Sequence, residues 1–105
     1  MNTKKAISLT ELKKLLASNT TNLRVIDIRR AEEYNKLHIP DAENIAAEEL
    51  KNQVALFSKN DTIVCICNKG HERSQSAAEF LYNSGFENTF YLEGGTLGWF
   101  ETPNS

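Results

Sequence analysis

Cysteine and proline are scarce in this 105-residue chain, which has two residues of each. Cys65 and Cys67 lie two positions apart on an expected strand, where the geometry is poor for a mutual disulfide. Two such cysteines cannot form the disulfide framework of a small secreted domain. We therefore expect a reducing, cytoplasmic compartment.

Long apolar runs and a strong excess of one charge are missing as well. The N-terminal segment MNTKKAISLTELKKLL has lysines between its hydrophobic positions, which argues against a secretion signal or a membrane span. The formal net charge is −2, and no basic run is interleaved with aromatic residues. Neither nucleic acid nor a membrane is therefore an expected partner.

The length and composition suit one globular domain. A chain of 105 residues can bury one hydrophobic core, and its 40% apolar and 25% charged residues are ordinary proportions. We find no internal repeat, linker or low-complexity segment. We expect a single domain over residues 1–105, ordered from about residue 4 to 101, with a frayed tail at 102–105.

Strand-like and helix-like segments alternate along the chain, which predicts a three-layer α/β domain with a mainly parallel, five-stranded sheet flanked by helices. The apolar, β-branched segment at Thr62–Cys67 is expected to be the central strand. The other expected strands are Ala6–Ser8, Leu23–Ile28, a brief one at Ile45, and Phe90–Leu92. The expected helices are one after a Ser8/Glu11 capping box, Ala31–Lys36, Ala46–Phe57, Ser74–Ser84 and a last turn at Thr96–Phe100. In Ser74–Ser84, the residues expected to face the core are Ala77, Ala78, Phe80 and Leu81.

The segment CNKGHERS, Cys67 to Ser74, follows the expected central strand and leads into a helix. Ligands bind beyond the carboxyl ends of parallel strands, where a helix start offers free backbone N–H groups and a positive dipole end. Gly70 permits the backbone curl that aims these amides at one centre, and Arg73 and Lys69 add positive charge. These features favour the thiolate. We expect Cys67 to have a pKa below about 8.5, to be open to solvent and to act as a nucleophile.

The cysteines allow two other interpretations. Cys67 as a mere core residue is disfavoured by the nearby glycine and arginine and by Ser74, which we expect to cap the following helix. Cys65, within the apolar strand, is expected to be an inert hydrophobic residue. A metal site of Cys65, Cys67 and His71 would have only three ligands, one of them inside a strand, so no metal is expected. His71 is instead expected to be an exposed loop residue.

Four segments resemble, in order, the rhodanese-like sulfurtransferase family, and together they cover nearly the whole chain. They are VIDIRRAEEY at 25–34, HIPDAENI at 38–45, IVCICNKGHERS at 63–74 and GFENTFYLEGGTLGW at 85–99. The resemblance implies a rhodanese-like domain in which Cys67 is the catalytic nucleophile and no cofactor is required. It also implies that the substrate anion is bound by the loop residues Asn68, Lys69, Gly70, His71, Glu72, Arg73 and Ser74.

The resemblance further implies structural roles for Asp27, Arg29 and Glu33. Asp27 is expected to supply hydrogen bonds near the strand ends. Arg29 and Glu33 are four positions apart, a spacing at which a short helix pairs opposite charges. His38 is expected to be a satisfied structural histidine, and Trp99 to pack in the core near the loop.

The length of the loop leaves the substrate open. Five residues separate Cys67 from Arg73, a spacing that resembles phosphatases and arsenate reductases of the same fold, whereas the common sulfurtransferase loop has four. Gly70, three positions after the cysteine, and the ending GGTLGW resemble the sulfurtransferases.

We expect first a sulfurtransferase that moves sulfane sulfur from a small sulfur-containing anion, thiosulfate or a persulfide donor, through a Cys67 persulfide. The acceptor would be cyanide or a thiol, including a protein thiol. A phosphatase or arsenate reductase is the first alternative, with Glu72 or His71 as the proton donor. A non-catalytic sulfur carrier or binding module is the second.

Overall fold

Five strands form one sheet in the computed structural model of this chain, which describes residues 5–18 and 22–101. The strands are β1 (Ala6–Ile7), β2 (Leu23–Asp27), β3 (Glu43–Asn44), β4 (Thr62–Ile66) and β5 (Thr89–Leu92). Their order is β1-β5-β4-β2-β3, and all neighbours are parallel. The α/β fold and its five-stranded sheet are confirmed. The tail expected to fray at 102–105 lies outside the described residues.

The central strand β4 is buried on both faces. Ile63, Cys65 and Cys67 belong to the hydrophobic core on one side of the sheet, and Val64 and Ile66 to the core on the other. Successive side chains of a strand point to opposite faces, so a strand covered on both sides needs an apolar residue at every position. This requirement accounts for the uninterrupted apolar run of the segment.

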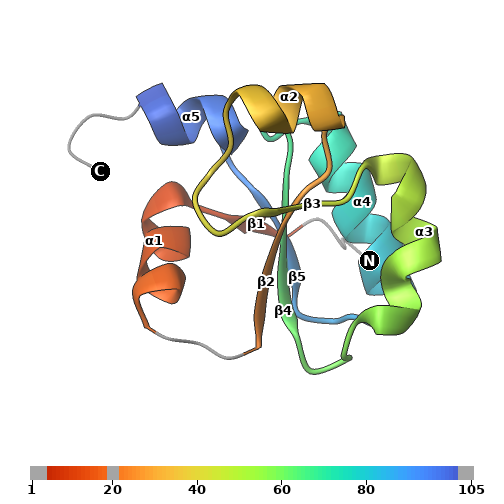
Figure 1. Ribbon diagram of the computed structural model, residues 1–105. Helices are drawn as coiled ribbons and strands as arrows, with labels where there is room; N and C mark the ends of the chain where they lie inside the picture. The colour runs from red at the N-terminus through yellow and green to blue at the C-terminus, as the bar shows by residue number, and fades with distance from the viewer. Residues whose placement is uncertain (1–4, 19–21, 102–105) are drawn as a thin grey trace.

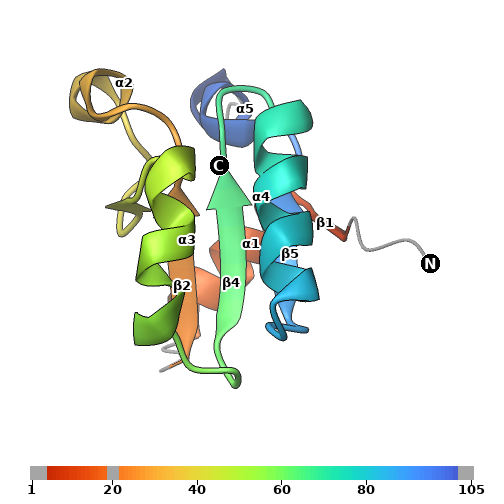
Figure 2. The same cartoon turned by 90° about the vertical axis from the view of Figure 1, so that its right-hand side faces the viewer.

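Helices cover both faces of the sheet (Figures 1 and 2). The helices are α1 (Leu9–Ala17), α2 (Ala31–Lys36), α3 (Leu50–Gln53), α4 (Glu72–Asn83) and α5 (Gly95–Glu101). α3 and α4 pack on one face, and α1 and Trp99 of α5 pack on the other. α2, α5 and the start of α4 surround the carboxyl end of β4 (Figure 2). Every helix in the described ranges is too short or too polar to cross a membrane.

The start of α1 has the capping box that was expected. The hydroxyl of Ser8 accepts a hydrogen bond from the backbone N–H of Glu11, and the Glu11 carboxylate accepts one from the N–H of Ser8. Two backbone donors that a helix start leaves unpaired are thereby satisfied. The local sequence pattern was sufficient to predict this boundary.

The helix expected over Ala46–Phe57 is broken, and that prediction is wrong. The four-residue α3 lies between two 3-10 turns, Ala47–Glu49 and Val54–Leu56. Leu50 is the only fully buried residue of these three pieces. A short helix depends on a continuous face packed against the core, and one buried side chain does not provide it.

Two further boundaries differ from the expectation. The brief strand is Glu43–Asn44 and not Ile45, although the Ile45 N–H still bonds to the Asp27 carbonyl at the end of β2. α4 begins at Glu72 with His71 as its N-cap residue, so Ser74 lies inside the first turn and does not cap the helix. The hydroxyl of Ser74 instead lies 3.2 Å from the sulfur of Cys67.

One residue expected in the core lies outside it. Ala77, Ala78 and Leu81 are buried on α4, but Phe80 is 39% exposed. The buried residues form a narrow stripe, and Phe80 is displaced from its centre by roughly a quarter turn or more, at 100° per residue. The prediction that Phe80 faces the core is therefore wrong.

Candidate active site

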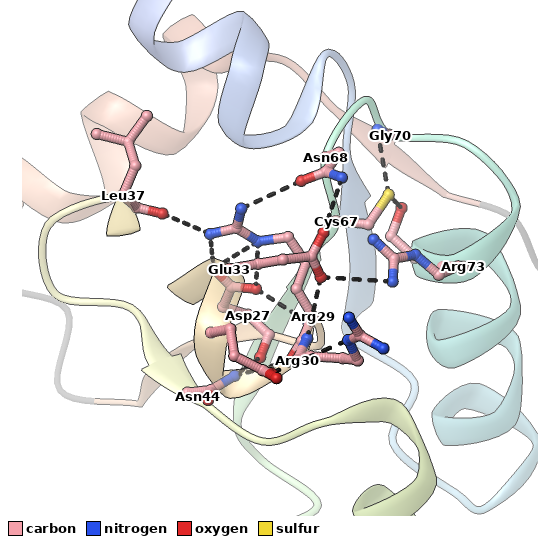
Figure 3. A network of polar contacts seen from close by, with 12 residues as sticks. Asp27, Arg29, Arg30, Glu33, Leu37, Asn44, Cys67, Asn68, Gly70 and Arg73 are labelled. Carbon is pink, nitrogen blue, oxygen red and sulfur yellow. Dashed lines mark hydrogen bonds and ion pairs between the residues drawn. The ribbon is translucent and has the colours of Figure 1, made fainter. Parts of the chain in front are cut away.

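The loop CNKGHERS connects the carboxyl end of β4 to α4. The Sγ of Cys67 accepts a hydrogen bond of 3.2 Å from the backbone N–H of Gly70 (Figure 3). A second hydrogen bond of 3.2 Å joins Sγ to the hydroxyl of Ser74. Cys67 lines a hollow of about 540 Å³ together with five other loop residues, which are Asn68, Lys69, His71, Glu72 and Arg73. We call this space the cysteine hollow.

Cys67 is less exposed than expected. Only 3% of the residue is accessible, because the following residues curl over it, and Cys67 borders the cysteine hollow. Lys69, His71, Glu72 and Arg73 are exposed around that hollow, whereas Ser74 is fully buried. The expectation of an open cysteine is corrected to a buried one at the wall of a hollow.

The pKa of Cys67 lies below its ordinary value. Burial by itself would raise the pKa of this thiol, but the Ser74 hydroxyl and the backbone N–H groups of Ser74, Lys69 and Gly70 stabilise the thiolate and outweigh burial. The lowered pKa was expected, but it was ascribed partly to the charges of Lys69 and Arg73. In the structure Lys69 acts on the sulfur through its backbone amide.

Ser74 responds to ionisation of the neighbouring thiol. With a neutral Cys67, the S–H donates to the Ser74 oxygen, and the Ser74 hydroxyl donates to the His71 carbonyl at 3.3 Å. Loss of the thiol proton leaves the sulfur with acceptor capacity only. The Ser74 hydroxyl then donates to the sulfur, which is how it favours the thiolate.

Cys65 behaves differently from Cys67, although the two lie on the same face of β4. Cys65 is fully buried, and burial, followed by the negative charge of Cys67, raises the pKa of Cys65 to about 12. Both cysteines are free. A thiol that stays protonated and shielded is inert, as was expected for this residue.

Gly70 allows the loop to turn toward the sulfur. Its φ is +76°, and a Cβ at this position would lie 2.5 Å from the carbonyl oxygen of Leu92 and 2.8 Å from the nitrogen of Gly94. Only glycine adopts this backbone conformation at no steric cost, and any side chain here collides with β5 and the turn after it. Gly70 thereby directs its own N–H at Cys67.

The start of α5 holds the loop from behind, a contact that sequence reasoning missed. The N–H groups of Thr96 and Leu97 donate to the carbonyls of Cys67 and Asn68, both at 2.9 Å. Gly94 and Gly95 have φ values of +83° and +58°, which bring α5 against the loop. The Gly-Gly pair predicted a turn, but nothing in the local pattern indicated that the segment after this turn contacts the loop that follows β4.

Asp27 and Arg29 form a buried ion pair at the end of β2. The carboxylate of Asp27 accepts hydrogen bonds from Nε, Nη2 and the backbone N–H of Arg29, and the Nη2 distance is 2.8 Å. Hydrogen bonding to Asp27 raises the pKa of Arg29 further. Arg29 also donates to the Leu37 carbonyl at 2.6 Å and to the side-chain oxygen of Asn68 at 3.1 Å. The pair thus fixes the loop residue next to Cys67.

Glu33 contacts the loop and not its expected partner. The predicted Arg29–Glu33 ion pair is wrong, because Arg29 precedes α2 and its guanidinium turns back to Asp27. Glu33 instead accepts a hydrogen bond from the Asn68 amide at 3.1 Å, and its other carboxylate oxygen lies 3.8 Å from Nη1 of Arg73 (Figure 3).

The electrostatic balance at Glu33 also favours its charged form. Burial would raise the pKa of Glu33, but the bonds from Asn68 and the Arg30 N–H, with the charge of Arg73, lower it overall. Glu33 therefore remains an anion that holds Asn68 and faces Arg73.

His38 and Trp99 are not among the residues that line the cysteine hollow. Nδ1 of His38 lies 2.8 Å from the Tyr34 carbonyl, and its ring stacks on that of Tyr34, which agrees with a satisfied histidine. Trp99 is half-buried against the core on the α1 side. Within residues 5–18 and 22–101, no three His, Cys, Asp or Glu side chains gather as metal ligands.

Comparison with known proteins gives consistent matches. The family model described as "Rhodanese-like domain" matches residues 8–102. A putative sulfur carrier protein of Bacillus subtilis, YrkF, is 33% identical over 93 residues, which are 89% of this chain but only 49% of that protein. The thiosulfate sulfurtransferase GlpE of Shewanella oneidensis is 29% identical over 101 residues, 96% of this chain and 97% of the relative.

A solved structure agrees with these sequence matches. The crystal structure of a rhodanese-related protein from Thermoplasma volcanium has a TM-score of 0.79 and 28% identity to this chain. The similarity covers 92% of this chain and 91% of the other.

Proposed function

This chain belongs to the family of rhodanese-like domains, and we propose that it is a sulfurtransferase that carries a sulfane sulfur on Cys67. One observation carries the proposal: a thiol whose pKa is lowered by converging donors lines a hollow that Arg73 also lines. A stabilised thiolate beside a cation is suited to attack an anionic sulfur donor. Relatives named as a thiosulfate sulfurtransferase and as a sulfur carrier support the same chemistry.

In the first proposed step, the Cys67 thiolate attacks the outer sulfur of thiosulfate. A bond forms between Sγ and the outer sulfur as the sulfur–sulfur bond of thiosulfate breaks. Sulfite leaves with the electron pair of that bond, and the negative charge of Cys67 passes to the transferred sulfur. The products are a Cys67 persulfide anion and sulfite, so atoms and charge balance.

The loop is arranged to hold the charges of this step. Arg73 lines the cysteine hollow and is half-exposed, so its guanidinium can bind the oxygens of the donor as they enter. The N–H groups that stabilise the thiolate are fixed by Gly70 and by the bonds from α5. Donors that need no rearrangement during the reaction stabilise the developing charge efficiently.

In the second step, an acceptor attacks the outer sulfur of the persulfide. With cyanide as the acceptor the product is thiocyanate, and with a thiolate as the acceptor the product is a new persulfide. In both cases the Cys67 thiolate is the leaving group and is thereby regenerated. This cycle uses no metal or organic cofactor. Because it requires reduced cysteine, and both cysteines are free, we propose that it operates in the cytoplasm.

Intact-mass measurement after incubation with thiosulfate tests the proposal. We expect the wild-type protein to gain one sulfur atom and to release one equivalent of sulfite. Cys65→Ala should behave like the wild type, and Cys67→Ala should gain nothing while remaining folded. Absence of both the mass gain and the sulfite would refute the proposal.

A second candidate is a phosphatase, and the five-residue spacing between Cys67 and Arg73 favours it. The longer loop surrounds a hollow of about 540 Å³, which admits a tetrahedral oxyanion, and the exposed Glu72 lines that hollow and would serve as the proton donor. We would measure hydrolysis of an activated aryl phosphate between about pH 5 and 8, with Cys67→Ser as the control. Equal rates for the two proteins would remove this candidate.

A further inference from the structure

A second hollow adjoins the cysteine hollow. It has a volume of about 580 Å³, and Glu72 and Arg73 line both spaces. Its apolar lining comes from the segment around α3 and from one face of α4, and consists of Ala47, Leu50, Ala77 and Phe80. We call it the side groove. Because the two spaces share Arg73, a ligand held by this residue can extend into both.

We propose that the side groove binds the organic group of a sulfane-sulfur donor whose reacting sulfur enters the cysteine hollow. The inference rests on the proposed function and narrows its substrate class. The donor would be a thiosulfonate or persulfide with an apolar group of about one aromatic ring. Inorganic thiosulfate has no such group and leaves the side groove empty.

Phe80 is the feature that points to an apolar occupant. This residue is 39% exposed, and it lies in a hollow with the buried Leu50 and Ala77. Single exposed apolar residues are common and carry no meaning alone, but here the aromatic residue is part of a concave lining that shares Glu72 and Arg73 with the cysteine hollow. The charged residues Glu48 and Lys51 also line the groove, so its apolar part is confined to Ala47, Leu50, Ala77 and Phe80.

The spacing along α4 sets the size of the ligand. Arg73 and Phe80 are seven positions apart, which is two helical turns or about 10 Å. A ligand whose anionic part contacts Arg73 therefore reaches Phe80 with a group the size of a substituted benzene ring. The groove volume lies within the range of ordinary small-molecule sites.

The reaction of such a donor balances within this arrangement. The Cys67 thiolate attacks the terminal sulfur of R–SO₂–S⁻, the S–S bond breaks, and the sulfinate R–SO₂⁻ leaves with the electron pair. Cys67 is left as a persulfide anion. In this arrangement the sulfonyl oxygens lie beside Arg73, which lines both spaces. The transferred sulfur then lies in the cysteine hollow, and the R group lies in the side groove.

Two donors with the same reacting group test the inference. We would compare p-toluenethiosulfonate with methanethiosulfonate, using cyanide as acceptor and thiocyanate formation as the readout. We expect kcat/KM of the wild type to be about tenfold higher for the tolyl donor, which corresponds to ~1.4 kcal/mol. Phe80→Ala should lower kcat/KM for the tolyl donor about fivefold and leave the methyl donor unchanged.

Two further variants control for indirect effects. Phe100→Ala removes a phenylalanine of similar exposure, 45%, from α5 outside the groove. It should leave kcat/KM unchanged for both donors. Ser76→Phe fills the groove from an exposed position on α4, and should reduce only the tolyl reaction. Thermal unfolding of each variant would show that the fold is retained.

The outcomes separate this inference from the proposed function. If the wild type has equal kcat/KM for the two donors, or if Phe80→Ala lowers kcat/KM equally for both donors, the inference is overturned. The proposed sulfur transfer would remain intact in either case. If no donor yields thiocyanate, the proposed function fails, and binding of p-toluenesulfonate measured by calorimetry still tests the groove. No binding, or equal binding by wild type and Phe80→Ala, would then overturn the inference.

Discussion

The replacement Ser74→Ala tests the electrostatic basis of the candidate active site. It removes the hydroxyl that lies 3.2 Å from Sγ of Cys67 and keeps the backbone N–H of Ser74, which also stabilises the thiolate. Burial of Cys67 remains, and burial raises the pKa of a thiol. The balance therefore shifts toward the neutral thiol, and the pKa of Cys67 should rise.

The size of the shift follows from one charged hydrogen bond. Such a bond contributes about 1.5–3 kcal/mol, and one pKa unit corresponds to about 1.36 kcal/mol. The hydroxyl gives up its 3.3 Å bond to the His71 carbonyl when it turns to the sulfur, so the net effect lies at the lower end. We expect the pKa of Cys67 to rise by about one unit.

The pH dependence of alkylation by iodoacetamide measures this pKa directly. Below both pKa values, Ser74→Ala should react about tenfold more slowly than the wild type, because about tenfold less thiolate is present. At high pH the two rates should converge. Cys65 will not contribute, since burial raises its pKa to about 12.

Ser76→Ala is the matched control. It removes an exposed hydroxyl from the same helix and should leave the profile of Cys67 unchanged. A midpoint that is the same in Ser74→Ala as in the wild type, or that moves equally in both variants, would refute the role of the Ser74 hydroxyl in stabilising the thiolate.

Three other replacements address the loop and its support. Arg73→Ala should raise KM for thiosulfate about tenfold in steady-state assays, because a half-exposed charged hydrogen bond contributes ~1.5 kcal/mol; an unchanged KM would exclude contact with the donor. Asp27→Ala leaves the buried Arg29 unpaired and should cost about 3–5 kcal/mol in urea unfolding, whereas a loss below ~1 kcal/mol would mean that the pair is dispensable. Gly70→Ala should cost about 1–3 kcal/mol and slow alkylation of Cys67, since its Cβ would overlap Leu92 and Gly94; normal alkylation would contradict the role of its turn.

Local patterns were sufficient for several parts of the fold. The apolar run of β4 predicted a strand covered on both faces, and the capping box predicted the start of α1. The loop after β4 was correctly placed next to a helix start, with a glycine at its turn. These features depend on residues that are neighbours in the chain, so their signal is present in the sequence.

Errors arose where packing, not propensity, decides the outcome. The segment Ala46–Phe57 has helical character, but it packs one fully buried residue and breaks into short turns. Phe80 satisfies an apolar helical pattern, yet the narrow buried stripe of α4 excludes it. Periodicity indicates which residues share a face and does not indicate how wide the covered part of that face is.

By itself, the sequence determined the parallel sheet, the position of Cys67 at its carboxyl edge and the turn at Gly70. Only the tertiary structure decided how that turn is held: Arg29 and Glu33 bind Asn68, and the α5 amides bind the loop carbonyls from behind. These partners are brought together from distant parts of the chain by the order of the strands. A hydrogen bond between such residues depends on the relative positions of whole helices and strands. A local sequence pattern does not predict these positions.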